Sequence, residues 1–580
     1  MANGLAPLFL AAFLAAVLLC GCSGSYTGPR LTVTNETLAE VDSRIFGQFL
    51  ERASWGEPGP EAALLPGTHT LDPRVVTLMK HMKIPLLRFP GGSDVDYIDW
   101  RDMVSNAPGR EGKPRPTTVG HTGGRITNRF GLDEFLALCD ELDSQPLLVV
   151  KVLAAVRDMQ TLEQVAYEAA AYVAYCNAPL GVDLPGDLEK WPRLRARNGH
   201  PAPYGVKLWQ AGNELWIVQG KVQREEHLGL DTPQKAADRY AECLTAVIDR
   251  MKQVDPSITI LMDGPRREDS VLARLSKRPG IRRRVEILTH HAYAPGPMQQ
   301  PDNADPNQFG DADWWRVFVA MPGEYDPNGQ CVAFGDVYRQ YTEMCKTTGV
   351  TEWNWNGWGE RKLKPRPGFD PLWAAGVGSA GFLHGLIRNA AHVKLANQSL
   401  LVGRSWGITA IRVDPDGNEP PGLLPTGVTT MLSARNHGRW LVRSELGQVP
   451  TVPVDLRIGW ATPPGTVALL DAVTTADEGR LYLHVINRSW DRDLPLRVTL
   501  KGLGTPRAVT RYGWQAQPRN STPFIRDLTD LLEGEPVKVD PTEPTLHIPA
   551  RSVNVYVWDL KQAGGASGSL AGAGLREATR

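Results

Sequence analysis

The chain has no excess of charge of either sign, because 63 Lys and Arg residues stand against 64 Asp and Glu residues. A balanced chain creates no broad electrostatic field, so nucleic acid and anionic membrane surfaces are not expected partners. The chain also lacks a cysteine framework. Beyond residue 22 its cysteines are odd in number and form no C-x-x-C pair, which predicts neither a zinc site nor a set of disulfides. The balanced charge favours a neutral ligand.

A long hydrophobic run is also missing. The apolar stretch from Leu5 to Leu19 is shorter than the roughly 20 residues that cross a bilayer, and it suits the apolar part of a secretion signal. The following Leu19-Cys20-Gly21-Cys22 resembles a bacterial lipobox, which predicts a signal segment over residues 1–22 and a lipid anchor on Cys22. We therefore expect export across the inner membrane and attachment at the cell envelope. No Lys or Arg precedes the apolar stretch, so plain secretion or an uncleaved anchor stays open.

At 580 residues the chain is too long for one ordinary core, so we expect two domains. Over residues 44–401, short apolar runs alternate with helical patterns, which is typical of parallel strands joined by crossover helices. This order predicts a (β/α)8 TIM barrel. The expected strands are Ile45–Leu50, Leu86–Phe89, Leu147–Val152, Val206–Gln210, Ile258–Met262, Val285–Thr289, Val350–Trp353 and His392–Leu395.

Helices and long loops complete this pattern. Apolar residues at three- and four-residue spacing predict helices at Pro73–Lys83, Leu132–Leu142, Leu162–Tyr175 and Pro233–Gln253. Segments rich in Gly, Pro or charge predict long loops at Asp94–Asn128, Asn177–Tyr204 and Ala294–Asn328, and in a barrel such insertions usually build the rim of the active site. Gly120, Gly123 and Gly124 lie in the first loop, but no P-loop lysine follows them, so nucleotide binding is not predicted.

Residues 402–561 show a different pattern, in which alternating strands are separated by turns. This predicts a C-terminal antiparallel β-sandwich. Residues 23–43 are expected to form a tether followed by a strand, Leu31–Thr34, that joins this sandwich. Residues 562–580 are rich in Gly and Ala and are expected to be disordered.

Two glutamates occupy positions suited to catalysis. Glycoside hydrolysis needs two carboxyl groups on either side of one bond, and barrel enzymes place such groups at the carboxyl ends of strands. Glu214 follows the fourth expected strand and Glu352 lies in the seventh. The structural alternative for each is a surface or ion-paired glutamate, but their joint placement matches a large clan of retaining barrel glycosidases.

Five motifs carry a family resemblance. One is the segment that runs from Arg197 to Asn213-Glu214. The other four are Phe46-Gly-Gln-Phe-Leu-Glu51, Leu87-Arg-Phe-Pro-Gly-Gly92, Thr289-His-His-Ala-Tyr293 and Thr351-Glu-Trp-Asn354. In this order they resemble motifs of glycoside hydrolase family 51, the α-L-arabinofuranosidases, and the first resembles that family's acid/base region. The resemblance runs from about Leu31 to Leu560.

The resemblance implies roles for individual residues. Glu214 corresponds to the acid/base and Glu352 to the nucleophile. Asn213 corresponds to the residue that bonds the 2-hydroxyl of the sugar. Glu51 corresponds to the glutamate that binds arabinofuranose hydroxyls. Arg88 corresponds to the guanidinium that holds the nucleophile and lowers its pKa, although it could instead be an ion pair that only braces the barrel.

Further residues are implied to line the sugar subsite. His291 and Tyr293 belong to this set, and Trp355, in the aromatic stretch after Glu352, is expected to join it. His291 could instead be a core histidine. Ser93 and Leu400 are expected to face the same subsite. Ser93 stands where the family commonly has Asn, and Leu400 stands where it usually has a sugar-binding Gln. These two departures bear on sugar preference more than on the chemistry.

The resemblance implies a retaining, exo-acting α-L-arabinofuranosidase that acts on plant-type polysaccharides or oligosaccharides. It implies no cofactor and no catalytic metal, and it includes a homo-oligomer among the candidate partners. A membrane would be contacted only through the lipid anchor. Two alternatives stay open: a related retaining glycosidase acting on another sugar, such as a β-xylosidase or β-glucanase, and a non-catalytic surface lipoprotein that binds glycans.

Overall fold

The structure is a computed structural model that describes most of the chain: residues 27–294, 310–320, 325–328, 330–345, 347–355, 370–404, 406, 409–414, 416–454, 465–517 and 524–561. Cys22 and the tail over residues 562–580 lie outside the described residues. Among the helices of the described part, none is both long and apolar enough to cross a membrane.

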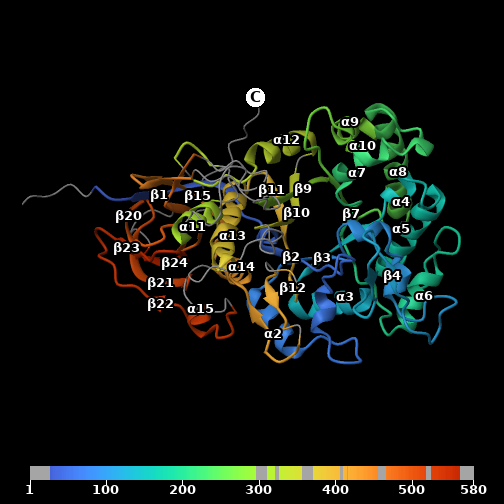
Figure 1. Cartoon of the computed structure of the whole chain (residues 1–580), viewed down its shortest axis with the longest axis horizontal. Coiled ribbons are helices and arrows are strands. Elements are labelled where there is room, and N and C mark those ends of the chain that lie inside the picture. Colours follow the sequence, from blue (N-terminus) through green and yellow to red (C-terminus); the bar gives the residue numbers. More distant parts are fainter. Residues whose placement is uncertain are drawn as a thin grey trace, which may run out of the picture.

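Eight parallel strands form a closed barrel in the order β10-β11-β2-β3-β6-β7-β8-β9, which confirms the predicted TIM barrel (Figure 1). Each overlaps an expected strand. Their bounds are β2 (Gly47–Phe49), β3 (Leu86–Phe89), β6 (Gln145–Val150), β7 (Leu208–Ala211), β8 (Thr259–Asp263), β9 (Ile287–Ala294), β10 (Thr347–Trp355) and β11 (Val393–Ser399).

The helices expected between the strands are present as α2 (Pro73–Met82), α3 (Leu132–Leu142), α5 (Leu162–Asn177) and α8 (Pro233–Val254). Two of the expected loops contain helices of their own, α6 (Lys190–Arg197) and α11 (Asp311–Val319). Both helices are short and bury Trp side chains. Short helices are marginally stable alone, so tertiary packing stabilises these two, and their sequences did not predict them. The other helices are α4 (Leu153–Val156), α7 (Leu215–Val222), α9 (Val271–Ser276), α10 (Pro279–Arg282), α12 (Gly335–Cys345), α13 (Pro371–Arg388), α14 (Pro425–Arg435) and α15 (Thr529–Glu533).

A nine-stranded, mostly antiparallel sheet forms the second domain, with the order β22-β21-β24-β19-β18-β15-β1-β20-β23. Its strands are β1 (Arg30–Glu40), β15 (Trp440–Gly447), β18 (Leu470–Asp477), β19 (Arg480–Asn487), β20 (Leu494–Lys501), β21 (Thr505–Gln515), β22 (Glu535–Pro536), β23 (Thr545–Ile548) and β24 (Ser552–Lys561). The N-terminal strand β1 lies between β15 and β20. The sheet curves over itself into a sandwich, since Tyr556 of β24 donates to the carbonyl of His547 in β23 although these strands are far apart in the sheet order.

Residues 402–436 lie between the two domains in sequence. They contain the small sheet of β12 (Val402–Gly403), β13 (Ile411–Arg412) and β14 (Gly422–Leu423), followed by α14, which packs against α13 and α2. The first C-terminal strand of the sandwich therefore begins at Trp440 and not directly after the expected boundary at residue 401. Helix α13 is buried along almost its whole length and lies between barrel and sandwich (Figure 1).

The barrel interior changes from apolar to polar along the strands. Leu86, Leu208, Leu261, Ile287 and Leu395 form one apolar cluster inside the barrel. Successive side chains of a strand point to opposite faces, so the residue two positions later faces the same side. Those residues are Arg88, Gln210, Asp263, Thr289 and Asn397, all buried. The apolar layer thus supports a polar layer at the carboxyl ends of the strands, where barrel enzymes place their chemistry.

Candidate active site

Glu352 lies on β10 with both carboxylate oxygens bound. Arg88 Nη1 donates to Oε1 at 2.9 Å, and the hydroxyl of Tyr293 on β9 donates to Oε2 at 2.9 Å. The residue is only 7% exposed. Two donors on opposite oxygens fix the orientation of the carboxylate, which is the condition for a nucleophile that must attack along one direction.

Arg88 connects Glu352 to the end of strand β7. It is fully buried, and its other nitrogens donate to Gln210 Oε1 at 3.1 Å and to Asn213 Oδ1 at 2.6 Å. Its guanidinium carbon also lies 4.3 Å from the centre of the Phe49 ring. A buried cation is tolerated when its donors are satisfied in this way. One side chain therefore sets the relative positions of residues from β3, β7 and β10.

Glu214 follows β7 in a tight turn. Its φ is 49°, in the left-handed region that non-glycine residues rarely adopt, and Gly212 just before it has φ 83°. Burial raises the pKa of Glu214, although the positive charges of Arg266, Arg88 and His121 oppose this effect. A carboxyl group that holds its proton at higher pH is suited to act as a general acid.

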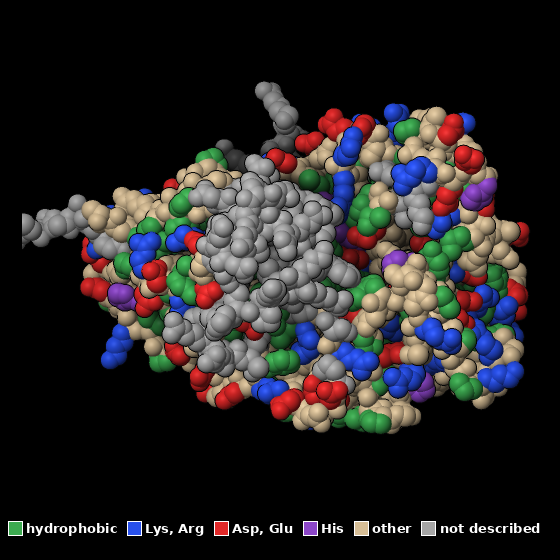
Figure 2. Space-filling view, in the orientation of Figure 1, with side chains coloured by type: hydrophobic (Ala, Val, Ile, Leu, Met, Phe, Trp, Pro, Cys, Tyr) green, Lys and Arg blue, Asp and Glu red, His purple; other side chains and the backbone are tan. Residues whose placement is uncertain are grey.

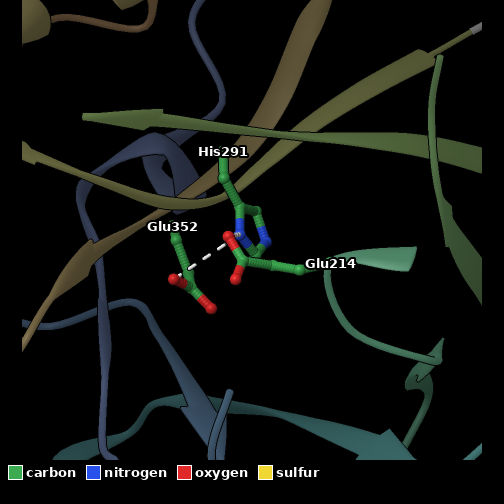
Figure 3. A group of neighbouring side chains, drawn as sticks. All are labelled: Glu214, His291 and Glu352. Atoms are coloured by element: carbon green, nitrogen blue, oxygen red, sulfur yellow. Dashed lines mark hydrogen bonds and ion pairs between the residues drawn. The ribbon is translucent and has the colours of Figure 1, made fainter. Parts of the chain in front are cut away.

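His291 lies beside both glutamates, as Figure 3 shows. Its Nδ1 is 3.0 Å from Glu214 Oε1 and 3.5 Å from Glu352 Oε2, while its Nε2 is 3.1 Å from Thr351 Oγ1. Burial lowers the pKa of His291 to about 3, even though the charge of Glu352 acts in the opposite direction. The imidazole is therefore neutral and adds no positive charge between the two carboxyl groups.

The two carboxyl groups are close together. One oxygen of Glu214, one oxygen of Glu352 and a ring nitrogen of His291 all lie within 4.8 Å of one another. Inverting glycosidases separate their carboxyl groups by about 6.5–9.5 Å to leave room for water, whereas retaining enzymes keep them about 5–5.5 Å apart. The same spacing could hold a metal ion, but Arg88 at 2.9 Å from Glu352 would repel a cation there.

Glu51 and Asn213 provide groups that can bind a sugar. The backbone N–H of Gly92 donates to Glu51 Oε1 at 2.8 Å, and burial together with the charge of Glu352 raises the pKa of Glu51 to about 8. A Cβ at Gly92 would lie 2.9 Å from Glu51 Oε1, so a side chain there would displace the Glu51 carboxyl group. Asn213 Nδ2 is buried and has no hydrogen-bond partner within the described part of the chain. It is a donor that a ligand hydroxyl can satisfy.

The surface on the side shown in Figure 2 is hollowed. In Figure 2 a depression opens near the centre of the view, beside the grey residues, and acidic and histidine side chains are visible at it.

Comparisons with known proteins agree with this geometry. Residues 78–308 match the family model described as the alpha-L-arabinofuranosidase 1 domain. The intracellular exo-α-(1→5)-L-arabinofuranosidase of Streptomyces lividans is 25% identical over 531 residues, which cover 86% of this chain and 71% of the relative. A Bacillus subtilis protein of the same description is 26% identical over 64% of this chain and 69% of the relative.

Solved structures extend the similarity to the whole architecture. The family 51 α-L-arabinofuranosidase from Thermotoga petrophila superimposes with a TM-score of 0.64 at 22% identity and covers 91% of this chain and 99% of its own. The Thermotoga maritima α-L-arabinofuranosidase in its arabinose complex gives a TM-score of 0.64 at 20% identity, over 92% of this chain and 100% of its own. The chain is a glycoside hydrolase similar to the α-L-arabinofuranosidases of family 51.

One predicted site residue packs away from the two glutamates. Trp355 was expected to bind substrate, but it is fully buried, its indole nitrogen donates to the carbonyl of Phe318 at 3.2 Å, and its ring packs on that of Phe318 in α11. The reason is the alternation of β10: Glu352 faces the barrel interior, and Trp355, three positions later, faces the surrounding helices. In this structure Trp355 therefore packs against α11 and does not line the group of side chains around Glu352.

The two departures from the family pattern are placed differently. Ser93 directly follows Gly92 at the start of the 3-10 helix η3 (Ser93–Asp96) and is half-buried. It therefore lies next to the backbone that contacts Glu51. Leu400 is 1% exposed and belongs to the large apolar core cluster.

Sequence reasoning missed Asp263, which braces the turn that carries Glu214. It is fully buried at the end of β8. Its Oδ2 accepts the backbone N–H of Leu215 at 3.0 Å, and its Oδ1 accepts the hydroxyl of Thr289 at 2.9 Å. Burial raises its pKa to about 7. The rule that singled out the two glutamates, a carboxylate at the end of a barrel strand, would also have found this residue.

Proposed function

We propose that this chain is a retaining, exo-acting α-L-arabinofuranosidase of glycoside hydrolase family 51 that releases arabinofuranosyl groups from plant-type polysaccharides or oligosaccharides. The observation that carries the proposal is the pair of unlike carboxyl groups within 4.8 Å: Glu352, oriented by two donors, and Glu214, whose pKa burial raises. The names of the related proteins support the choice of sugar.

In the first step the Glu352 carboxylate attacks the anomeric carbon while Glu214 gives its proton to the glycosidic oxygen. The bond between that carbon and oxygen breaks, the leaving alcohol departs, and the sugar is covalently attached to Glu352. In the second step Glu214, now ionised, takes a proton from water, the water oxygen attacks the anomeric carbon, and Glu352 leaves. Two inversions give net retention of configuration.

Other side chains support this sequence by binding and orientation. Arg88 holds both Glu352 and Asn213, which leaves Asn213 Nδ2 free to donate to a sugar hydroxyl. With a pKa of about 8, Glu51 carries a proton at neutral pH and can donate to a second hydroxyl. These donors act in a buried site, where hydrogen bonds are stronger than in water.

The test is hydrolysis of a panel of aryl glycosides by the purified enzyme. We expect turnover of the α-L-arabinofuranoside. NMR should detect the α-anomer of arabinose, and not the β-anomer, as the first product. Glu352→Gln should lower kcat by more than about a thousandfold because it removes the nucleophile. Glu111→Gln is the matched control, because Glu111 is exposed.

The panel also decides between the alternatives. Turnover of a β-xyloside or β-glucoside in preference to the arabinofuranoside would overturn the choice of sugar and leave the chemistry in place. Binding of glycans with no turnover of any substrate would overturn the assignment as an enzyme. Release of the inverted anomer first would contradict the roles of Glu352 and Glu214.

We also propose that the enzyme is exported and lipid-anchored through Cys22. The support is the lipobox-like segment that ends at Cys22, which lies outside the described residues. Metabolic labelling of cells that express the whole chain with a radioactive fatty acid should mark the processed protein in the membrane fraction. Cys22→Ser should abolish the label, and a label that persists in this variant would refute the anchor site.

A further inference from the structure

Arg266, in the loop that follows β8, carries a positive charge that no carboxylate of the described residues neutralises. The residue is exposed. The next residue, Arg267, forms an ion pair with Asp269 at 2.8 Å between Nη2 and Oδ2. Among the described residues Arg266 forms no such pair, so its charge is available to a ligand.

Two contacts hold this guanidinium group in place. Its Nη2 donates to the backbone carbonyl of His291 at 2.7 Å, and its central carbon lies 4.3 Å from the centre of the Trp216 ring. The Trp216 ring in turn meets the His291 ring edge-on, with the two centres 4.9 Å apart. A guanidinium has five N–H donors, and Arg266 makes no other hydrogen bond within the part of the chain that the structure describes. Its remaining donors can therefore bind a ligand.

The same contacts connect Arg266 to the acid/base residue Glu214. Trp216 is the second residue after Glu214, in the first turn of α7. His291 lies beside Glu214, with its Nδ1 3.0 Å from Glu214 Oε1 (Figure 3). Arg266 therefore contacts both the helix that follows Glu214 and the histidine next to it. The electrostatics agree with this placement: burial is the largest influence on the pKa of Glu214 and raises it, and the charge of Arg266 is the strongest of those that lower it.

The barrel topology places Arg266 on the side of the leaving group. Strands β7 and β8 are neighbours in the barrel, and Glu214 follows the first while Arg266 follows the second. The leaving group lies against Glu214, because Glu214 gives its proton to the oxygen that departs. Glu214 is also the more open of the two carboxyl groups, with a side chain 19% exposed against 9% for Glu352. The departing sugar therefore lies beside the loops that follow β7 and β8, and Arg266 is a cation in one of these loops.

We propose that Arg266 binds a carboxylate on the leaving group, so that the enzyme favours arabinofuranosyl groups attached to a uronate over those attached to a neutral sugar. The planar fork of a guanidinium matches a carboxylate, and the face of Trp216 holds the guanidinium plane. The sugar that is transferred is neutral, and the negative charge belongs to the sugar that departs. This inference rests on the proposed function, since it names the substrate class of the same site.

The test compares two substrates that differ in one charge: a disaccharide of α-L-arabinofuranose linked to galacturonate, and the methyl ester of the same disaccharide. Both have the same leaving oxygen, so any effect of a variant on Glu214 or His291 changes both rates by the same factor and cancels in their ratio. Arg266→Gln removes the charge and Arg266→Lys keeps it. Arg267→Gln is the matched control, because Arg267 is also exposed but is paired with Asp269.

We expect the wild-type kcat/KM to be about three- to fivefold higher for the acid than for the ester, which is the size of effect that an exposed ion pair allows. This preference should disappear in Arg266→Gln and persist in Arg266→Lys and Arg267→Gln. It should also shrink in roughly 1 M NaCl, where charges are screened within about 3 Å.

Two results would overturn the inference: equal kcat/KM values for acid and ester in the wild type, or a preference for the acid that survives in Arg266→Gln. Turnover of 4-nitrophenyl α-L-arabinofuranoside without cleavage of either disaccharide would also overturn it, while the proposed function would stand. If the wild-type enzyme hydrolyses none of these three substrates, the proposed function itself fails.

Discussion

Replacing Arg88 with lysine tests whether the guanidinium orients the catalytic groups or only braces the barrel. Its three nitrogens donate to three different acceptors, Gln210 Oε1, Glu352 Oε1 and Asn213 Oδ1. A lysine keeps the charge, but its single nitrogen on a flexible stem cannot reproduce the planar fork. At least one of the acceptors therefore loses its partner in a site where Arg88 is fully buried.

The size of the effect follows from these contacts. A hydrogen bond to a charged group contributes about 1.5–3 kcal/mol, and each 1.4 kcal/mol of transition-state stabilisation corresponds to about a tenfold change in rate. Loss of the correct Glu352 geometry should therefore lower kcat about 10- to 100-fold. KM should change less, because the contact acts on the nucleophile and not directly on the substrate.

The assay is steady-state hydrolysis of an aryl α-L-arabinofuranoside together with thermal unfolding. Arg195→Lys is the matched control: Arg195 is also fully buried, but it donates to backbone carbonyls, those of Tyr175 and Ala178 among them. It should lower Tm and leave kcat unchanged. If Arg88→Lys unfolds at the wild-type temperature and keeps full kcat, Arg88 does not orient the nucleophile and the reasoning fails.

Three further outcomes are expected. Asp263→Ala should lower Tm and should lower kcat about tenfold, because the N–H of Leu215 loses its acceptor beneath the acid/base turn. Asp263→Asn can still accept that N–H and should lose much less of both. Equal effects of the two variants would contradict this role. Glu51 has a pKa raised from its usual 4.5 to about 8, so the stability it contributes is present below about pH 4.5 and is lost as pH rises toward 8. The Tm of Glu51→Gln should therefore rise relative to the Tm of the wild type between pH 5 and pH 8. A difference in Tm that stays constant over this range would refute the shift. Trp355→Phe should lower Tm and leave KM unchanged, because the indole donates to the carbonyl of Phe318 outside the barrel interior, and a raised KM with normal Tm would restore Trp355 to the substrate site.

The sequence contained enough information to locate the two glutamates. Parallel strands in a closed barrel point their carboxyl ends to the same face, so side chains that follow any two strands meet there regardless of their separation in the chain. Strand alternation gives the inward-facing positions, and the same alternation argues against Trp355, which lies an odd number of residues from Glu352. The strand-end rule would likewise have found Asp263.

Tertiary structure alone decided how the loops meet the barrel. The sequence gives no local signal that the hairpin at residues 118–126 would pack on Ser54 and Asp94. That close contact is possible because glycines in the hairpin have no Cβ to clash with these residues, which becomes evident only when the two segments are seen together. It also gives no signal that α13 would be enclosed between barrel and sandwich, and although it predicts that the N-terminal strand joins the sandwich, it does not say that β1 pairs with β15 and β20. The sequence determines strand periodicity and strand-end position because both are local properties. Contacts between distant segments set the orientation of His121 and the environment of each carboxyl group. Those contacts exist only in the folded chain.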